Sequence, residues 1–239
     1  MTRHAEHVAI YMGGCDVWTQ SQGLSAASGL GAAVLAASAA VETAVAAGVQ
    51  QLTLVYPNPP PFPSDEIAAA GLEPFLKTQR DRFAALRVKV LGNLAGMPQP
   101  LLQGLRSLHH EAGHGPGMKL TLLWNYSGRA DLLSVARELA LETKSHGLPV
   151  EAITPKLIES RLASAHLAPV DLLICCGPAP VLPDALLFET AYAELCFPSR
   201  LWPDFSPGDL LAALAEFGAR ERRFGKTSAQ VHSGLETNQ

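Results

Sequence analysis

The chain has 239 residues, of which 48% are hydrophobic and 17% are charged, and its formal net charge is −4. Soluble domains average about 25% charged residues, so this composition predicts one globular domain with a large core and a surface partly covered by a partner. The slightly acidic balance excludes the basic footprint of a nucleic-acid-binding protein.

The cysteines and the apolar stretches together predict a reduced, cytoplasmic protein. Cys175 and Cys176 are adjacent, a spacing that suits neither a zinc site nor a disulfide framework. The N-terminal segment MTRHAEH lacks the apolar centre of a signal peptide. Ala26–Val49 is long enough to cross a bilayer, but it is rich in alanine and carries Glu42. We therefore predict a buried helix there, and at most peripheral membrane contact.

Short apolar runs alternate with helical patterns along the chain. In chain order, the predicted elements are a strand at His7–Met12, a helix at Gly31–Ala47, a strand at Gln51–Tyr56, a helix at Ser64–Leu86, a strand at Arg87–Leu91, a helix at Gln99–Glu111, a strand at Met118–Trp124, helices at Arg129–His146 and Pro155–His166, a strand at Val170–Cys176 and a helix at Pro207–Arg223. Such alternation predicts an α/β domain, at residues 1–226, whose mostly parallel sheet has helices on both faces. Residues 227–239 are expected to form a polar, disordered tail.

Ligands of parallel sheets bind beyond the carboxyl ends of the strands. The loops after Met12, Tyr56, Trp124 and Cys176 are therefore expected to surround the site. The first of these loops reads MGGCDVW, and it holds no lysine, no arginine and a single carboxylate, that of Asp16. A glycine turn of this kind is a common phosphate cradle, but here it lacks positive charge.

Seven segments, taken together and in order, resemble the cis-prenyltransferases, the undecaprenyl diphosphate synthase family. They are HVAIYMGG at 7–14, GVQQLTLVY at 48–56, LLWNYSGRADL at 122–132, APVDLLICCG at 168–177, LLFETAYAELCF at 186–197, LWPDF at 201–205 and RERRFG at 220–225. Members of this family extend an allylic diphosphate with isopentenyl diphosphate, using Mg²⁺. The resemblance covers most of the chain and implies the same fold.

The resemblance also implies losses at the catalytic loop. The family's first loop reads MDGNGRWA, in which the Asp holds magnesium and the Arg binds phosphate. Gly13 stands at the Asp position and Val17 at the Arg position. A further Arg and His of the family correspond to Ala26 and Leu30.

The strand that ends at Cys176 is followed by similar losses. Cys175 and Val181 stand where the family has arginines that bind isopentenyl diphosphate, Ala179 stands at a Glu position and Pro183 at a Ser position. Each lost charge-assisted contact costs roughly 1.5–3 kcal/mol, and a leaving diphosphate needs such stabilisation. We therefore expect no catalytic residue for ordinary prenyl transfer, with Asp16 the one residual candidate.

Other family positions are retained, and the resemblance implies substrate-binding roles for them. They are Asn125, Arg129, Arg222, Arg223 and Gly225. Arg129 at a helix start and the two C-terminal arginines also fit structural roles, the latter as favourable charges at a helix C-terminus.

A metal site is the least supported part of this prediction. If the chain is active, the resemblance implies Mg²⁺, with Asp16 and Glu194 as the candidate ligands. Glu194 equally fits a helix-cap or interface role.

Two further patterns predict no catalysis. HEAGH at 110–114 matches the H-E-x-x-H zinc motif, but the glycines and proline that follow end the helix such a motif needs. Cys15 has no identifiable histidine partner and is interpreted as a small turn residue.

Three functions remain open. The favoured one is a partner or regulatory subunit of an active cis-prenyltransferase, which resembles the non-catalytic subunits of heteromeric members. Such a subunit would pair with a homologue, or with a second copy, through Leu186–Phe197 and Pro207–Phe224. The alternatives are a prenyl-diphosphate enzyme of altered chemistry, namely a terpene cyclase or a condensing enzyme that uses Asp16, and a non-catalytic protein that binds prenyl lipids.

Overall fold

The computed structural model describes residues 4–57, 86–95, 102–103 and 117–220. In this part of the chain, six strands form one parallel sheet in the order β3-β4-β2-β1-β5-β6. The strands are β1 (His7–Met12), β2 (Gln51–Val55), β3 (Arg87–Gly92), β4 (Lys119–Trp124), β5 (Leu172–Cys176) and β6 (Glu194–Cys196). The predicted α/β class and parallel sheet are confirmed.

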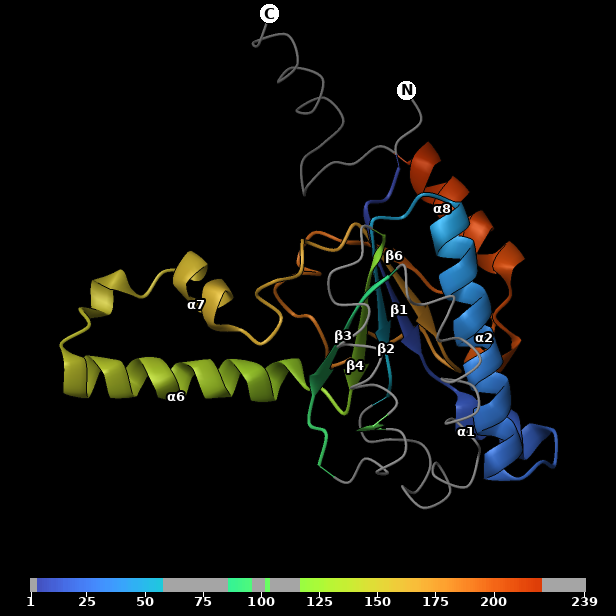
Figure 1. The fold of residues 1–239 in the computed structure, drawn as a ribbon, viewed down its shortest axis with the longest axis horizontal. Coiled ribbons are helices and arrows are strands. Elements are labelled where there is room, and N and C mark those ends of the chain that lie inside the picture. The colour runs from blue at the N-terminus through green and yellow to red at the C-terminus, as the bar shows by residue number, and fades with distance from the viewer. Residues whose placement is uncertain (1–3, 58–85, 96–101, 104–116, 221–239) are drawn as a thin grey trace, which may run out of the picture.

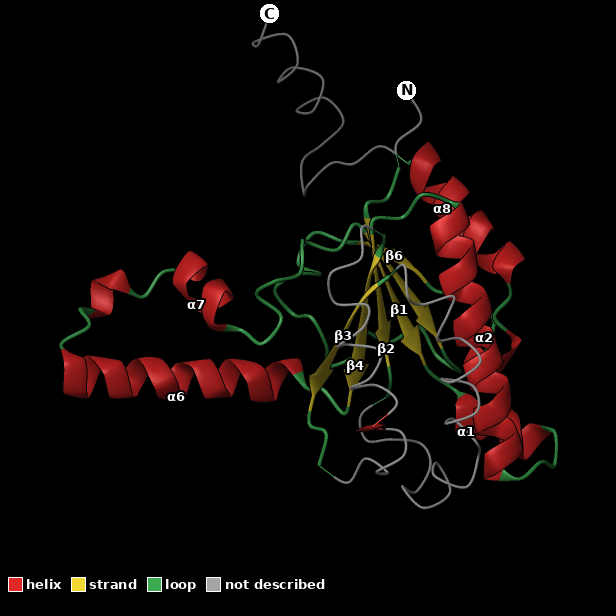
Figure 2. Ribbon diagram, in the orientation of Figure 1, coloured by secondary structure: helices red, strands yellow, loops and turns green. Residues whose placement is uncertain are grey.

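The described helices lie on one face of the sheet or project away from it. They are α1 (Cys15–Ser21), α2 (Ala26–Ala46), α6 (Gly128–His146), α7 (Pro155–Arg161) and α8 (Pro207–Ala219), with short 3₁₀ helices η1 (Val150–Ala152) and η2 (Trp202–Asp204). Figure 1 shows α2 and α8 side by side against the sheet, while α6 extends outward with α7 beside it. We call α6 and α7 the arm; Figure 2 shows that it is helical, whereas loops join it to the sheet.

Alternation along the strands separates two cores. Val8, Ile10, Ile174 and Cys176 face α2 and α8 in the larger core. Ala9 and its neighbours on adjacent strands face the opposite side, where they pack against Tyr126 and the apolar residues of two loops, Leu167, Val170, Ala185 and Leu186. A third cluster holds the two helices of the arm together.

Helix α2 presents a buried stripe of mostly small residues to the sheet. This stripe includes Leu30, Ala33, Ala40 and Ala44. The Ser25 side chain caps its first turn by accepting from the Ser28 amide. By length and composition α2 could cross a membrane, with 44% of the tested window buried. Its packing in the larger core agrees with the predicted buried helix, because small residues allow the helix to approach the sheet closely.

Several element boundaries differ from the sequence prediction, most by one or two residues, and α8 ends at Ala219 rather than Arg223. Helix α1 and strand β6 were not predicted, α2 begins at Ala26 rather than Gly31, and α7 ends at Arg161 rather than His166. Leu162 is extended, with ψ of 147°, because the next amide, that of Ala163, donates to the carboxylate of Asp131. The predicted helices at Ser64–Leu86 and Gln99–Glu111, the residues after Arg220 in the last helix, and the tail lie almost wholly outside the described residues.

Candidate functional site

The centre of the sheet places the loops after β1 and β5 next to each other. Strand β1 lies between β2 and β5. From β1 the chain continues to β2 on one side, and it later adds β5 on the other side, so the strand order reverses at β1. Met12 and Cys176, the last residues of β1 and β5, are register partners. In open α/β sheets this reversal is where ligands bind. The candidate site is therefore formed around Gly13, Gly14 and Gly177.

Gly13 occupies a packed position in this site. A Cβ atom built there would lie 2.5 Å from the carbonyl oxygen of Cys176 and 2.6 Å from the ring of Tyr11. The carbonyl of Gly13 also accepts a hydrogen bond of 3.0 Å from the Trp202 amide. Any side chain at position 13 would require the two loops to move apart, because one of its close contacts is backbone.

Helix α1 begins directly after this turn. Gly14 has φ of 84°, a left-handed conformation that favours glycine. Asp16 is exposed in the first turn, and Val17 is exposed beside it. The Cys15 thiol is buried, and it donates to the carbonyl of Met12 at 3.6 Å. Burial raises the pKa of Cys15 to about 12, so the thiol is not a nucleophile at neutral pH.

The end of β5 brings two more thiols into this region. Cys175 and Cys176 are buried and point to opposite faces of the sheet. Burial raises the pKa of Cys175 to about 12 and that of Cys176 further still. Val181, farther along the same loop, is exposed. At the two positions where the resemblance implies arginine, the structure thus places an uncharged buried thiol and an exposed apolar side chain.

Two arginines lie beyond the carboxyl ends of the strands in the described part of the chain, and both face carboxylates. Arg129 follows β4 at the start of α6; its side chain is 85% exposed, and its Nε lies 3.9 Å from Asp184. Arg200 follows β6, and its Nε lies 3.8 Å from Asp209. Hydrogen bonds from Ser206 hold the pKa of Asp209 below its usual value, and Arg200 adds to this. The sequence analysis missed Arg200 because no motif contains it.

The region around Asn125 and Arg129 is organised by Asp184. The Ser127 hydroxyl donates to the Asp184 carboxylate at 2.7 Å, and the amide of Arg129 donates to it at 3.1 Å. The Gly128 amide donates to the backbone carbonyl of Asp184. Asn125 is left-handed, with φ of 45°, and accepts from the amide of Asn93. These contacts connect the start of α6 to the sheet.

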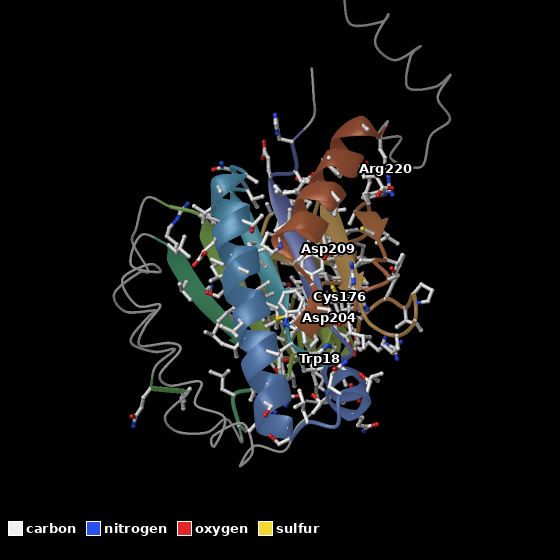
Figure 3. All side chains as sticks on the ribbon, turned by 90° about the vertical axis from the view of Figure 1, so that its right-hand side faces the viewer. Trp18, Cys176, Asp204, Asp209 and Arg220 are labelled. Atoms are coloured by element: carbon white, nitrogen blue, oxygen red, sulfur yellow. The ribbon has the colours of Figure 1, made fainter. Side chains whose placement is uncertain are left out.

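Glu194 lies at the amino-terminal end of the edge strand β6, whereas Asp16 follows the carboxyl end of the interior strand β1. The register partner of Glu194 is Leu172, the first residue of β5. Its carboxylate lies 3.7 Å from Arg220. Figure 3 shows Arg220 at one end of α8, with Asp209 and Cys176 toward the other. Within one chain, the two candidate metal ligands are therefore not brought together.

The remaining predicted site residues cannot be placed. Arg222, Arg223, Gly225 and the HEAGH segment lie outside the described residues. Within the described ranges, no three His, Cys, Asp or Glu side chains come together as a metal site.

Aromatic side chains beyond the carboxyl ends of the strands were also not identified from the sequence. The rings of Tyr56 and Trp124, which follow β2 and end β4, stack with centroids 4.5 Å apart. The hydroxyl of Tyr56 and the indole N–H of Trp18 are buried without a hydrogen-bond partner in the described structure. The stack becomes visible only from the pairing of β2 with β4, because Tyr56 and Trp124 are far apart in sequence.

Comparison with known proteins agrees with this geometry. A family model described as "Putative undecaprenyl diphosphate synthase" matches residues 11–225. The chain belongs to the cis-prenyltransferase family, whose members are transferases of isoprenoid biosynthesis.

Relatives across bacteria and a plant structure support this membership. A ditrans,polycis-undecaprenyl-diphosphate synthase of Pseudomonas syringae pv. tomato is 34% identical, over 95% of this chain and 93% of its own. An isoprenyl transferase of Chlorobaculum tepidum is 32% identical, over 94% and 87%. The crystal structure of lavandulyl diphosphate synthase from Lavandula x intermedia, in complex with dimethylallyl diphosphate, matches with a TM-score of 0.84 and 25% identity, over 93% of this chain and 99% of that one.

Proposed function

We propose that this cis-prenyltransferase-fold chain does not itself catalyse prenyl transfer and acts as a partner subunit of an active cis-prenyltransferase. The observation that carries this proposal is the packing of Gly13. The carbonyl of Cys176 and the ring of Tyr11 occupy the space that the side chain of an Asp at position 13 would need. The glycine at the family's Asp position is therefore required by the close contact between the loops after β1 and β5.

The magnesium ion that the family resemblance implies does not fit the described residues. Asp16 is exposed on α1, beyond the carboxyl end of β1, while Glu194 begins the edge strand β6 beside Arg220. Mg²⁺ requires near-octahedral oxygen ligands and is usually held by carboxylates together with substrate phosphates. A single exposed carboxylate is a weak site for this ion.

The diphosphate group is equally poorly matched. Diphosphates are bound by arginine forks and helix N-termini, and the negative charge that develops on a leaving diphosphate needs such groups. Arg129 and Arg200 face Asp184 and Asp209 instead. Loss of several charge-assisted contacts, at roughly 1.5–3 kcal/mol each, would slow transfer by many orders of magnitude.

Exposed apolar side chains support a partner surface. Leu187, Tyr192 and Phe197 are exposed within the predicted segment Leu186–Phe197, and Tyr192 is 68% exposed. Leu211 is exposed on α8. Large exposed apolar groups of this kind are typical of interaction surfaces, and a homologous subunit or a second copy of this chain is the partner that fits the family resemblance.

The experiment mixes the purified chain with an active cis-prenyltransferase from the same genome and measures both complex formation and incorporation of labelled isopentenyl diphosphate. We expect a stable complex whose rate falls when Arg222 and Arg223 are both changed to Ala, with complex formation unchanged. Exposed Arg137 on the arm, changed to Ala, is the matched control. Failure to form a complex, or an unaffected rate in the double variant, contradicts the proposal.

A second candidate function is prenyl transfer by the chain itself. The 34% identity to a synthase, over 95% of the chain, favours it. Asp16, the carboxylate in the first loop, would then be the residual metal ligand. Mg²⁺-dependent turnover by the isolated chain that disappears in Asp16→Asn, but persists in the exposed-acid control Glu151→Gln, would establish this function and exclude the first.

A further inference from the structure

The side chain of Glu189 is buried where the arm joins the body of the molecule. It is 7% exposed, and neither of its carboxylate oxygens has a hydrogen-bond partner in the described structure. Its backbone carbonyl accepts from the Val170 amide at 2.8 Å, which holds this turn against the start of β5. A buried carboxylate without a donor or counter-ion is strongly unfavourable, so Glu189 indicates that a ligand is required here.

A second carboxylate and two hydroxyls belong to the segments that pack beside Glu189. Asp131, in the first turn of α6, accepts from the Tyr126 hydroxyl at 2.8 Å and from the Ala163 amide at 3.1 and 3.2 Å. Ser164, the next residue, is fully buried, and its hydroxyl has no hydrogen-bond partner in the described structure. The segments that carry Asp131 and Glu189 pack together, because Leu132 and Phe188, their neighbours in sequence, both contact the arm cluster of Val135, Leu139 and Leu162.

Two arginines of the arm pair with other carboxylates. Arg129, in the first turn of α6, lies beside Asp184 and is exposed. Arg161, at the end of α7, donates to Glu138 and to both carboxylate oxygens of Glu142. Neither arginine forms an ion pair with Glu189 or Asp131 in the described structure.

We propose that Glu189 and Asp131, with the hydroxyls of Ser164 and Tyr126, bind one divalent cation. Carboxylates and hydroxyls are oxygen ligands, which select hard cations. Ca²⁺ accepts irregular, largely protein-derived coordination, whereas Mg²⁺ retains several waters that this enclosed position does not favour. The cation is therefore of the calcium class. Since only two carboxylates take part, the hydroxyl oxygens complete the ligand set.

The cation connects three segments that are distant in sequence. These are the start of α6, the connection from α7 to β5, and the turn that precedes β6. It thereby holds the arm at a fixed angle to the sheet. The cluster packs on the sheet face opposite α2 and α8, so this inference does not depend on whether the chain transfers prenyl groups.

Terbium luminescence tests the site in the full chain. Tb³⁺ replaces Ca²⁺ at oxygen sites, and excitation of Tyr126 sensitises its emission when the ion is bound nearby. We expect one saturable site per chain, displacement of Tb³⁺ by added Ca²⁺, and a Ca²⁺-dependent rise in Tm. Absence of saturable emission together with an unchanged Tm overturns the proposal and shows that Glu189 is satisfied by water alone.

Two variants separate binding from folding. Glu189→Gln keeps the side-chain shape, and it should weaken Tb³⁺ and Ca²⁺ binding at least tenfold; exposed Glu159 on α7, changed to Gln, should bind like the unmodified chain. If Glu189→Gln does not fold, Ser164→Ala takes its place and should weaken binding severalfold. Unchanged affinity in the folded variant contradicts the site.

Discussion

The carbonyl oxygen of Cys176 lies 2.5 Å from the position that a Cβ atom on Gly13 would occupy. This contact joins the loops after β1 and β5, at the centre of the sheet. It makes position 13 a packing residue.

Gly13→Asp should destabilise the protein and should not create prenyl-transfer activity. Forcing atoms into a packed position costs about 1–3 kcal/mol, so we expect the free energy of unfolding in urea to fall by that amount. Gly31 on α2 is the matched control, because a Cβ there meets nothing within 4 Å; Gly31→Ala should leave stability unchanged or raise it by about 1 kcal/mol. Substantial activity in a stable Gly13→Asp variant would contradict the proposed packing role.

The buried imidazole of His7 should make stability fall at acidic pH. Its Nδ1 lies 2.7 Å from the carbonyl of Ala168 and its Nε2 lies 2.9 Å from the hydroxyl of Thr53. The first contact requires Nδ1 to donate, so Nε2 accepts from Thr53. Burial is the largest influence and lowers the pKa of His7 below its ordinary 6.5.

The sign of the pH effect follows from proton binding. Below about pH 6.5 the unfolded chain takes up a proton on His7 that the folded chain does not, so folding becomes less favourable as pH falls toward the folded pKa. The slope is at most about 1.4 kcal/mol per pH unit. Urea unfolding from pH 7.5 to 5 measures it; His7→Phe should be less stable at pH 7.5 but show a shallower slope. The exposed His4→Gln serves as control, and an equal slope in both variants would exclude His7 as the source.

The buried thiols should be unreactive in the folded protein. Burial raises the pKa of Cys15 and Cys175 to about 12, and only the thiolate reacts rapidly. With iodoacetamide at pH 8 we expect labelling of half-buried Cys196 first, and of all four cysteines only after unfolding. Mass spectrometry of the peptides identifies each site, and rapid labelling of Cys15 in the native state would reopen a nucleophilic role for it.

Asp184 should matter more for stability than Arg129, with which it pairs. Asp184→Ala removes the acceptor of the Ser127 hydroxyl and of the Arg129 amide, and it should lower the free energy of unfolding by about 1–3 kcal/mol. Arg129→Ala should change it by less than about 0.5 kcal/mol, because the side chain is exposed. An equal loss of unfolding free energy in the two variants would mean that the Arg129–Asp184 ion pair, rather than the hydrogen bonds that Asp184 accepts, holds α6 in place.

Local patterns in the sequence determined the class of the fold. The apolar runs at β1 and β5 lack alternation, which indicates strands buried on both faces of a parallel sheet. The Thr154 side chain caps α7 as Ser and Thr do in general, accepting from the Leu157 amide. The family resemblance carried by short motifs indicated the same fold, and the structure confirms it.

The tertiary structure alone decided where elements stop and which residues meet. Strand β6 has three half-buried residues and no strong pattern of its own; it exists because β5 offers a free edge. Helix α7 ends early because Asp131, on another helix, binds the amide of Ala163. Likewise, the carbonyl that packs against Gly13 belongs to Cys176 on another strand. The turn that holds Glu189 is bonded to Val170 at the start of β5, so neither feature follows from sequence neighbours alone. Periodicity reports contacts within about four residues, whereas these depend on how the whole sheet assembles.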